Sequence, residues 1–216
     1  MSGPFTLESV DRDGAVREAA HAVAGDTRAD FVRKAVVAGG AFAGGAAMLA
    51  IPALAEGQGA SDVAILNFAL TLEHLEAAFY TEAVAKGALR GETLAFARVV
   101  KAHEVAHVRF LQRALGRAAV ARPRFDFKGT TEAQGAFQRT ARLLEDTGVM
   151  AYAGQAPLIS DDQVLKAALS VHTVEARHAA WIRHIVGQPP APAAFDPART
   201  RRRILAAVDA TGFIVG

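Results

Sequence analysis

The sequence predicts an all-α fold whose centre is a four-helix bundle. Apolar residues recur every three or four positions in four long segments, at about residues 61–86, 92–116, 131–152 and 161–187. No alternating strand pattern of useful length interrupts them. Short links join the first segment to the second and the third to the fourth, and short links favour antiparallel neighbours. We therefore expect two helical hairpins that form one bundle at residues 61–187.

Local residues mark the ends of the predicted helices. We expect Ser61 to cap the first helix, with Asp62 complementing the helix dipole. The fourth helix opens with the sequence Ser-Asp-Asp-Gln at 160–163, which is typical of a capping box. Gly87 lies in the first short link, and Gly154 lies in the second.

A longer connection joins the two hairpins. It covers residues 117–130 and contains Pro123 and Gly129. Fourteen extended residues reach roughly 46 Å, whereas a 25-residue helix is roughly 38 Å long. This connection is therefore long enough to cross the whole bundle, and we expect it to do so.

The first 55 residues differ from the bundle in composition. Residues 1–27 are polar and carry both signs of charge, so we interpret them as a leader. Residues 28–55 begin with basic side chains, continue as an uncharged run at 35–55 and end in Ala-Leu-Ala, which is typical of an export signal. The run is about 20 residues long, so an uncleaved membrane anchor is an alternative. A buried soluble helix is a third reading, but its many glycines make it a poor helix in water.

Residues 188–216 follow the bundle. Residues 189–197 are rich in Pro and Ala and are interpreted as a linker, and residues 198–209 are expected to form a short helix. This helix contains three consecutive arginines, the only dense basic run in the chain. The formal net charge is +2, and so short a cluster is usually a solvated helix end, so no nucleic-acid partner is expected.

The chain contains no cysteine. This excludes disulfides, thiol catalysis and metal sites built from thiolates. Any metal must therefore be held by carboxylate and imidazole groups.

One glutamate falls on the inner stripe of each predicted helix, near its middle. These four residues are Glu73, Glu104, Glu145 and Glu175. Glutamate is almost never fully buried without a partner, because burying an unpaired charge is costly. Two of the four are followed three residues later by a histidine, His107 and His178, and residues three apart are neighbours on a helix. The pattern indicates a metal site in the bundle core.

An internal repeat strengthens this interpretation. A single Glu-x-x-His motif is weak evidence, because Glu18 and His21 form one in the leader. In the bundle, however, each half contains a lone glutamate, then a hairpin, then Glu-x-x-His. The two tyrosines of the chain, Tyr80 and Tyr152, each lie seven residues after the lone glutamate. Seven residues are two helical turns, so we expect each phenol to face inward and bond a carboxylate or histidine of the facing helix. A simpler reading is that both tyrosines only fill the core near a helix end.

Other polar residues near these motifs have several readings. Glu76 also falls near the inner face and is a candidate extra ligand or hydrogen-bond partner. His103 and His172 are expected to flank the site, whereas His74 and His184 are expected to be solvated. Trp181 is most simply a packing residue near the end of the bundle.

The residues at 62–80, the two Glu-x-x-His motifs and the residues at 144–152 together resemble the ferritin-like superfamily. They are most similar to exported bacterial ferritin-like proteins related to desiccation-associated proteins. The resemblance implies a bundle with a crossover and a carboxylate-bridged centre of two Fe or two Mn ions. By the family's pattern the six ligands are Glu73, Glu104, His107, Glu145, Glu175 and His178. Glu104 and Glu175 would bridge the ions, and each histidine would complete one of them.

Several functions are compatible with such a centre. Oxygen-rich ligation of redox-active metals suits chemistry with O2 or peroxide, so iron oxidation or peroxide removal outside the cytoplasm is the leading hypothesis. A non-catalytic desiccation or stress protein that keeps the bundle is the alternative. An iron-storage cage fits less well, because an N-terminal anchor and a Pro-rich tail are awkward in a closed shell. Membrane attachment through residues 35–55 and a homo-oligomer both stay open.

Overall fold

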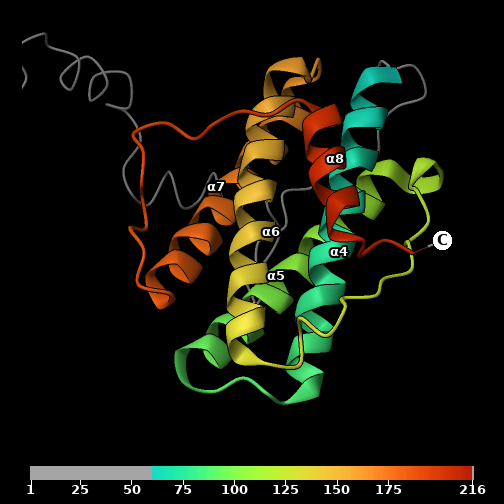
Figure 1. Cartoon of the computed structure of the whole chain (residues 1–216). Helices are drawn as coiled ribbons and strands as arrows, with labels where there is room; N and C mark the ends of the chain where they lie inside the picture. Colours follow the sequence, from blue (N-terminus) through green and yellow to red (C-terminus); the bar gives the residue numbers. More distant parts are fainter. Residues whose placement is uncertain (1–59, 216) are drawn as a thin grey trace, which may run out of the picture. The chain divides into compact units, whose positions relative to one another are not determined.

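The computed structural model describes residues 60–215, which are helical apart from loops and one isolated β-bridge (Figure 1). The long helices of this range are α4 (Ala60–Lys86), α5 (Gly91–Leu115), α6 (Gln134–Gln155) and α7 (Asp162–Ile185). A shorter helix, α8 (Arg201–Thr211), follows them. The predicted all-α class is confirmed, and the long helices begin and end within three residues of their predicted bounds. The predicted leader at 1–27 and the predicted signal or anchor at 28–55 lie outside the described residues.

Contacts between helices give their directions. Tyr80 of α4 bonds Glu145 of α6, and Tyr152 of α6 bonds Glu73 of α4. The residue that is later in α4 therefore meets the residue that is earlier in α6, so these two helices are antiparallel. The two other long helices, α5 and α7, are antiparallel by the same argument, because His103 contacts His178 while the later His107 contacts Glu175 on the preceding turn.

The connection from α5 to α6 crosses the length of the bundle, as predicted. Near its start, the Val120 backbone N–H donates to Asn67 Oδ1 (2.8 Å), in the first half of α4. Near its end, the Thr131 hydroxyl donates to Glu82 Oε1 (2.6 Å), close to the end of α4. The yellow-green trace in Figure 1 follows α4 between these points. The crossover makes α5 and α6 parallel, which a short loop could not achieve.

Two predicted helix caps are wrong. The first helix begins at Ala60, so Ser61 lies within it rather than before it. The N-cap of α7 is Asp161, whose carboxylate accepts hydrogen bonds from the backbone N–H groups of Gln163 and Val164 (2.8 and 2.9 Å). A capping box based on residue 160 is not formed, because the backbone N–H of residue 160 donates to Asp62 instead (2.9 Å).

The C-terminal segment packs onto the bundle. It contributes the buried side chains Ile204, Val208 and Phe213 to the main apolar cluster. Its last residues pair with the crossover, where the Asp126 backbone N–H donates to the Phe213 carbonyl (2.9 Å) and Phe125 and Ile214 form an antiparallel bridge. The predicted C-terminal helix is therefore present and is part of the folded unit.

The apolar core has two parts, one toward each end of the bundle. One contains Phe79 and Phe137, whose rings stack at 5.2 Å, and Phe96, which contacts Trp181 at 5.3 Å. The other contains aliphatic side chains, including Leu70. The predicted packing role of Trp181 is confirmed, and its indole N–H also donates to a glutamate on α5 (2.9 Å). A polar layer lies between the two apolar parts.

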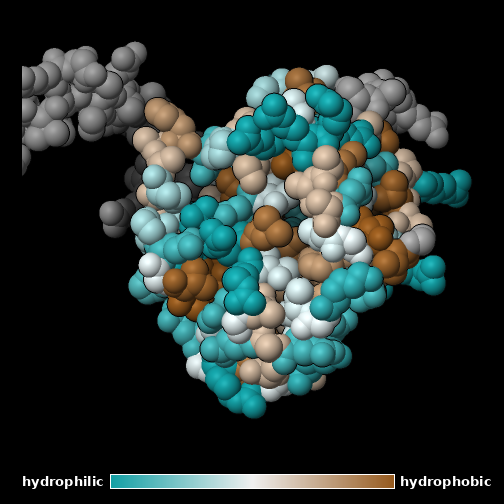
Figure 2. All heavy atoms as spheres, viewed as in Figure 1, coloured by the Kyte–Doolittle hydropathy of each residue, from teal (hydrophilic) through white to brown (hydrophobic). Residues whose placement is uncertain are grey.

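The molecular surface is mainly hydrophilic on the face shown in Figure 2, where apolar side chains form small separated patches. Within residues 60–215, none of the helices combines the length and the apolar character that a membrane span requires.

Candidate metal centre

Four glutamates meet in the polar layer between the two apolar clusters. Each long helix contributes one, and all four side chains belong to residues with no exposed surface. They are Glu73, Glu104, Glu145 and Glu175. Local helix geometry explains the convergence, because each lies on the stripe of its helix that faces the bundle axis. The structure therefore brings together the four carboxylates that the sequence pattern selected.

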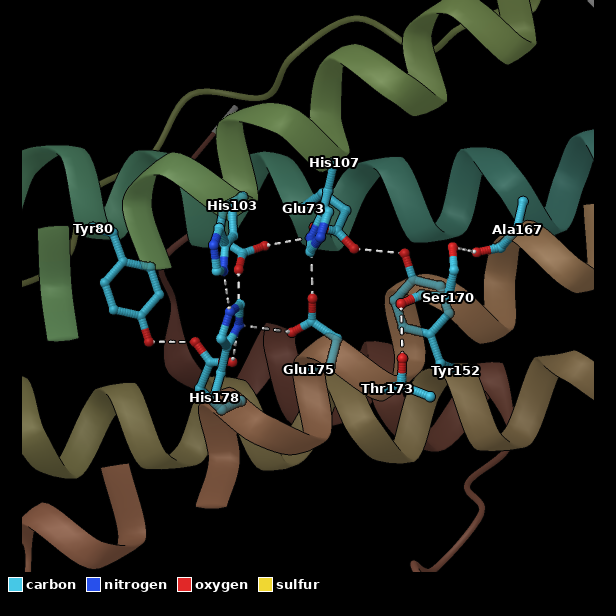
Figure 3. A network of polar contacts seen from close by, with 12 residues as sticks. Glu73, Tyr80, His103, His107, Tyr152, Ala167, Ser170, Thr173, Glu175 and His178 are labelled. Carbon is cyan, nitrogen blue, oxygen red and sulfur yellow. Dashed lines mark hydrogen bonds and ion pairs between the residues drawn. The ribbon is translucent and has the colours of Figure 1, made fainter. Parts of the chain in front are cut away.

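Two histidines complete two overlapping sets of polar atoms (Figure 3). His107 Nδ1 lies 3.2 Å from Glu73 Oε2, 3.3 Å from Glu104 Oε2 and 3.1 Å from Glu175 Oε1. In each set, one candidate ligand atom from each of four residues lies within 4.8 Å of the others.

The second set centres on His178. Its Nδ1 lies 3.1 Å from Glu104 Oε1, 3.3 Å from Glu145 Oε2 and 3.8 Å from Glu175 Oε2. Glu104 and Glu175 belong to both sets and present different oxygens to each of them. The six residues expected as ligands are thus distributed as two sets of four that share two members.

Several of these atoms are close to each other without forming hydrogen bonds. His178 Nδ1, Glu104 Oε1, Glu145 Oε2 and both oxygens of Glu175 are buried and have no hydrogen-bond partner. Buried polar atoms are nearly always paired, since an unpaired one costs free energy. A cation between them would satisfy all five atoms, and carboxylate oxygens and imidazole nitrogens are suitable donors for it. The residues present therefore fit a metal ion, and the cluster could hold one.

Both tyrosines donate to these carboxylates. The Tyr80 hydroxyl donates to Glu145 Oε1, and the Tyr152 hydroxyl donates to Glu73 Oε1 (2.5 Å). The expected contact of each phenol with the facing helix is therefore present. Each tyrosine engages one oxygen and leaves the other, Oε2, directed at a histidine. Such contacts fix the orientation of a carboxylate toward the centre of the site.

Burial and neighbouring charges change the acidities in the cluster. Burial raises the pKa of Glu145 to about 7, although its contact with His178 opposes the change. Burial also acts to raise the pKa of Glu175, but its contacts with His107 and His178 lower it to about 2. Burial would lower the pKa of His178, but the carboxylates of Glu104, Glu145 and Glu175 raise it to about 12. The cluster thus strongly favours positive charge at its centre.

Glu76 is a fifth buried carboxylate, with 3% of its surface exposed. Burial, and next the charge of Glu145, raise its pKa well above the usual value. It lies over Gly148 of α6, where a Cβ atom would be 3.5 Å from Glu76 Oε1 and 3.4 Å from Glu175 Oε2. The sequence pattern placed Glu76 near the inner face of its helix. The same pattern gave no indication that Gly148, on another helix, leaves space for the Glu76 side chain.

The remaining histidines have different environments. His103 is exposed, and its Nδ1 lies 2.8 Å from His178 Nε2, so it flanks the site as expected. His184 is exposed, also as expected, and His172 is half-buried. His74 was expected to be solvated, but only 3% of it is exposed. The expectation fails because the crossover covers this side of α4, where crossover residue Arg122 and His74 line the same groove.

The fold and the site together define the class of this protein, a four-helix bundle with a crossover and a buried carboxylate and histidine cluster. The family model described as a ferritin-like domain matches residues 61–188. Because the match covers more than half of the 216 residues, the chain belongs to this family. No curated protein matches the chain.

Proposed function

We propose that the cluster binds two metal ions, iron or manganese, in a carboxylate-bridged centre. The observation that carries this proposal is that Glu104 and Glu175 present separate oxygens to two sets of ligand atoms. One ion would lie with Glu73 and His107, and the other with Glu145 and His178. Four carboxylates also balance the charge of two divalent cations, which supports two ions rather than one.

The chemistry proposed for this centre is oxidation of Fe²⁺ by O2 or removal of peroxide. Iron or manganese with oxygen-rich ligands supplies the electron transfer that both reactions need. In the first reaction, O2 accepts electrons from Fe²⁺, which is then a substrate. In the second, one peroxide molecule is reduced while another is oxidised, so no further reductant is required.

The residues of the chain would support this chemistry by position and by exclusion of water. Tyr80 binds one oxygen of Glu145, and Tyr152 binds one oxygen of Glu73. The other oxygen of each glutamate lies near a site histidine and would be available to an ion. Phe79 and its neighbours close one end of the site, and Leu70 and its neighbours close the other. Exclusion of water strengthens the electrostatic interactions inside the site.

Metal analysis of the purified protein tests the proposal. The chain is loaded with Fe²⁺ without oxygen, or with Mn²⁺, and the bound metal is counted after gel filtration. We expect two ions per chain, loss of both in a Glu104→Ala, Glu175→Ala double variant, and no change in the matched surface variant His184→Ala. Binding of one ion or none per chain in the unsubstituted protein would contradict the proposal. Oxygen consumption with Fe²⁺ and disappearance of peroxide then distinguish the two reactions.

A structural stress protein is the second candidate. It is supported by the polar network itself, in which Tyr80, Tyr152 and both site histidines link all four helices through carboxylates. In that case Glu104→Ala lowers the stability of the bundle, while metal content stays at background with or without the substitution. The metal count in the unsubstituted protein therefore separates the two candidates.

We also propose that the protein acts outside the cytoplasm, because residues 28–55 have the pattern of an export signal. Cleavage after the Ala-Leu-Ala sequence leaves Glu56 as the first residue. N-terminal sequencing of protein from the cell envelope or the medium checks this. A chain that begins at Met1 or Ser2 and stays with the cytosolic fraction would contradict it.

A further inference from the structure

We propose that the two metal positions are not equivalent, and that the position at Glu145 and His178 binds a divalent ion more tightly than the position at Glu73 and His107. The reason is that two additional residues, Glu76 and His103, both support the position at Glu145 and His178. This inference rests on the proposed dinuclear centre and assigns a tight and a weak position within it.

The two halves of the bundle have the same order of site residues, which allows them to be compared position by position. Glu73 and Tyr80 of α4 correspond to Glu145 and Tyr152 of α6, with the same separation of seven residues. Likewise, the Glu-x-x-His motif of α5 corresponds to that of α7. If the halves were equivalent throughout, the two metal positions would have the same surroundings.

The correspondence fails at two positions. Three residues after the lone glutamate, α4 has Glu76 but α6 has Gly148. One residue before the Glu-x-x-His motif, α5 has His103 but α7 has Val174. In both cases the first half carries a group that can bind a metal ion or accept a hydrogen bond, and the second half carries none.

Glu76 and Gly148 are complementary in space. The glycine has no side chain, and Glu76 occupies the room above it, beside Glu175. On α4, Glu76 lies between Glu73 and Tyr80, and Tyr80 bonds Glu145. Gly148 likewise lies between Glu145 and Tyr152 on α6, so Glu76 faces the middle of the cluster. Of the four site carboxylates, Glu145 exerts the strongest charge effect on it. A fifth carboxyl group there offers a further oxygen ligand, or a hydrogen-bond partner, to the position that contains Glu145.

His103 acts on the same position through His178. Its Nδ1 lies 2.8 Å from His178 Nε2, and the two rings stack at 5.1 Å with 20° between their planes. A metal ion at His178 Nδ1 requires the ring proton to be on Nε2, from which it can be donated to His103 Nδ1. A hydrogen bond of this kind fixes both the tautomer and the orientation of a ligand histidine. Val174, at the corresponding place in the other half, is an alkyl side chain and cannot accept such a bond.

Titration of metal-free protein with Co²⁺, followed by calorimetry and visible absorption, tests this inference. Two binding steps are expected, one tight and one weak. Loss of a supporting contact to a ligand typically costs 10- to 100-fold in metal affinity, so Glu76→Gln and His103→Ala should each weaken the tight step by roughly that factor and leave the weak step unchanged. His178→Ala should remove the tight step, and His107→Ala the weak one.

A complementary substitution tests the same idea by a gain of affinity. Val174→His should supply the hydrogen-bond partner that His107 lacks and raise the affinity of the weak step. The difference in affinity between the two steps should then become smaller. His184→Ala is the matched histidine control and should change neither step. His103 and His184 are exposed and Glu76→Gln preserves side-chain shape, so these variants should fold, which circular dichroism checks.

The outcomes separate the inference from the proposed function. If the unsubstituted protein binds no Co²⁺ or only one ion, the dinuclear proposal itself fails. If it binds two ions, but Glu76→Gln and His103→Ala leave the tight step unchanged or weaken mainly the other step, the centre is dinuclear and the assignment of its tight position is wrong.

Discussion

At the scale of single residues, each glutamate in this core is tolerated because specific atoms are directed at its carboxylate. Glu145 shows this best, with Tyr80 bonded to one oxygen and His178 3.3 Å from the other. The carboxylate is completely buried, so its free energy depends on these few contacts rather than on water. Removing one of these contacts should therefore lower the free energy of unfolding more than removing a hydrogen bond at the surface does.

The substitution Tyr80→Phe tests this dependence. It keeps the ring in the aromatic cluster but leaves Glu145 Oε1 buried without its donor. An unsatisfied buried acceptor costs about 1–3 kcal/mol, and more when it is charged, so the free energy of unfolding should fall by at least this amount. Urea denaturation measures it, with Glu92→Ala as the control, because that substitution removes only the exposed hydrogen bond from the Trp181 indole and leaves the ring in place. Equal effects of the two substitutions would contradict the expectation.

Gly148 provides a second test at the residue scale. A Cβ atom there would lie 3.4 Å from its nearest neighbour, which is an ordinary contact, so Gly148→Ala should be accommodated. Alanine favours a helix interior by about 1 kcal/mol over glycine, and we expect metal-free Gly148→Ala to be more stable by up to that amount. Gly148→Leu should instead be destabilised by about 1–3 kcal/mol, because it overpacks the space of Glu76. Thermal or urea unfolding checks whether the free energy of unfolding rises in Gly148→Ala and falls in Gly148→Leu.

At the scale of elements, the bundle depends on contacts that hold helix ends and connections in place. Asp62 in the first turn of α4 accepts hydrogen bonds from backbone N–H groups at Ser160 and Asp161, which precede α7. The C-terminal segment is held similarly, because the Arg199 backbone N–H donates to the Met150 carbonyl of α6 (3.1 Å). These contacts join segments that are far apart in the sequence.

The C-terminal segment approaches α6 closely at Gly154. A Cβ atom at this residue would lie 1.9 Å from the Arg199 carbonyl oxygen, which is a backbone atom that cannot rotate away. Gly154→Ala should therefore displace the segment before α8 and expose part of the apolar surface that Ile204 and Val208 cover. Limited proteolysis should cut the 188–200 region faster, and the free energy of unfolding should fall by about 1–3 kcal/mol.

A matched control is available in Gly87, where a Cβ atom has no neighbour within 4 Å but the backbone has a φ of +69°. Gly87→Ala should cost some stability through backbone strain, yet leave proteolysis of the 188–200 region unchanged. If Gly154→Ala does not change the cleavage rate, the C-terminal segment does not depend on this close approach.

At the scale of the whole molecule, the proposed centre would couple all four long helices, since each contributes at least one ligand. An ion that binds only the folded chain stabilises it by an amount that depends on the free ion concentration relative to Kd. At 100 times Kd this is about 2.7 kcal/mol per site. Metal loading should raise the thermal midpoint, and a chelator should reverse the change. A Glu104→Gln, Glu175→Gln variant should show no such shift.

Much of the fold could be predicted because helical periodicity and connection length are local properties. The residues at 117–130 are too many for a tight link, and the crossover they predict is present along α4. The ends of the helices were harder to predict than the helices themselves. The residue that caps a helix depends on which nearby polar groups bond the free backbone N–H groups. The N-cap of α7 is Asp161, and the backbone N–H groups of residues 160 and 161 both donate to Asp62, a residue about 100 positions away.

The sequence by itself determined the four helices, their inward stripes and the glutamates, histidines and tyrosines that lie on them. A period of 3.6 residues tells which side chains share a face, and the doubled Glu, Tyr, Glu-x-x-His order shows that two halves face each other. Only the tertiary structure decided what covers each outer face and which side chains meet across the core. It buried His74 under the crossover, placed Glu76 over Gly148 and set His103 against His178. These contacts depend on how helices are rotated and on the path of a long connection, and no local pattern specifies either.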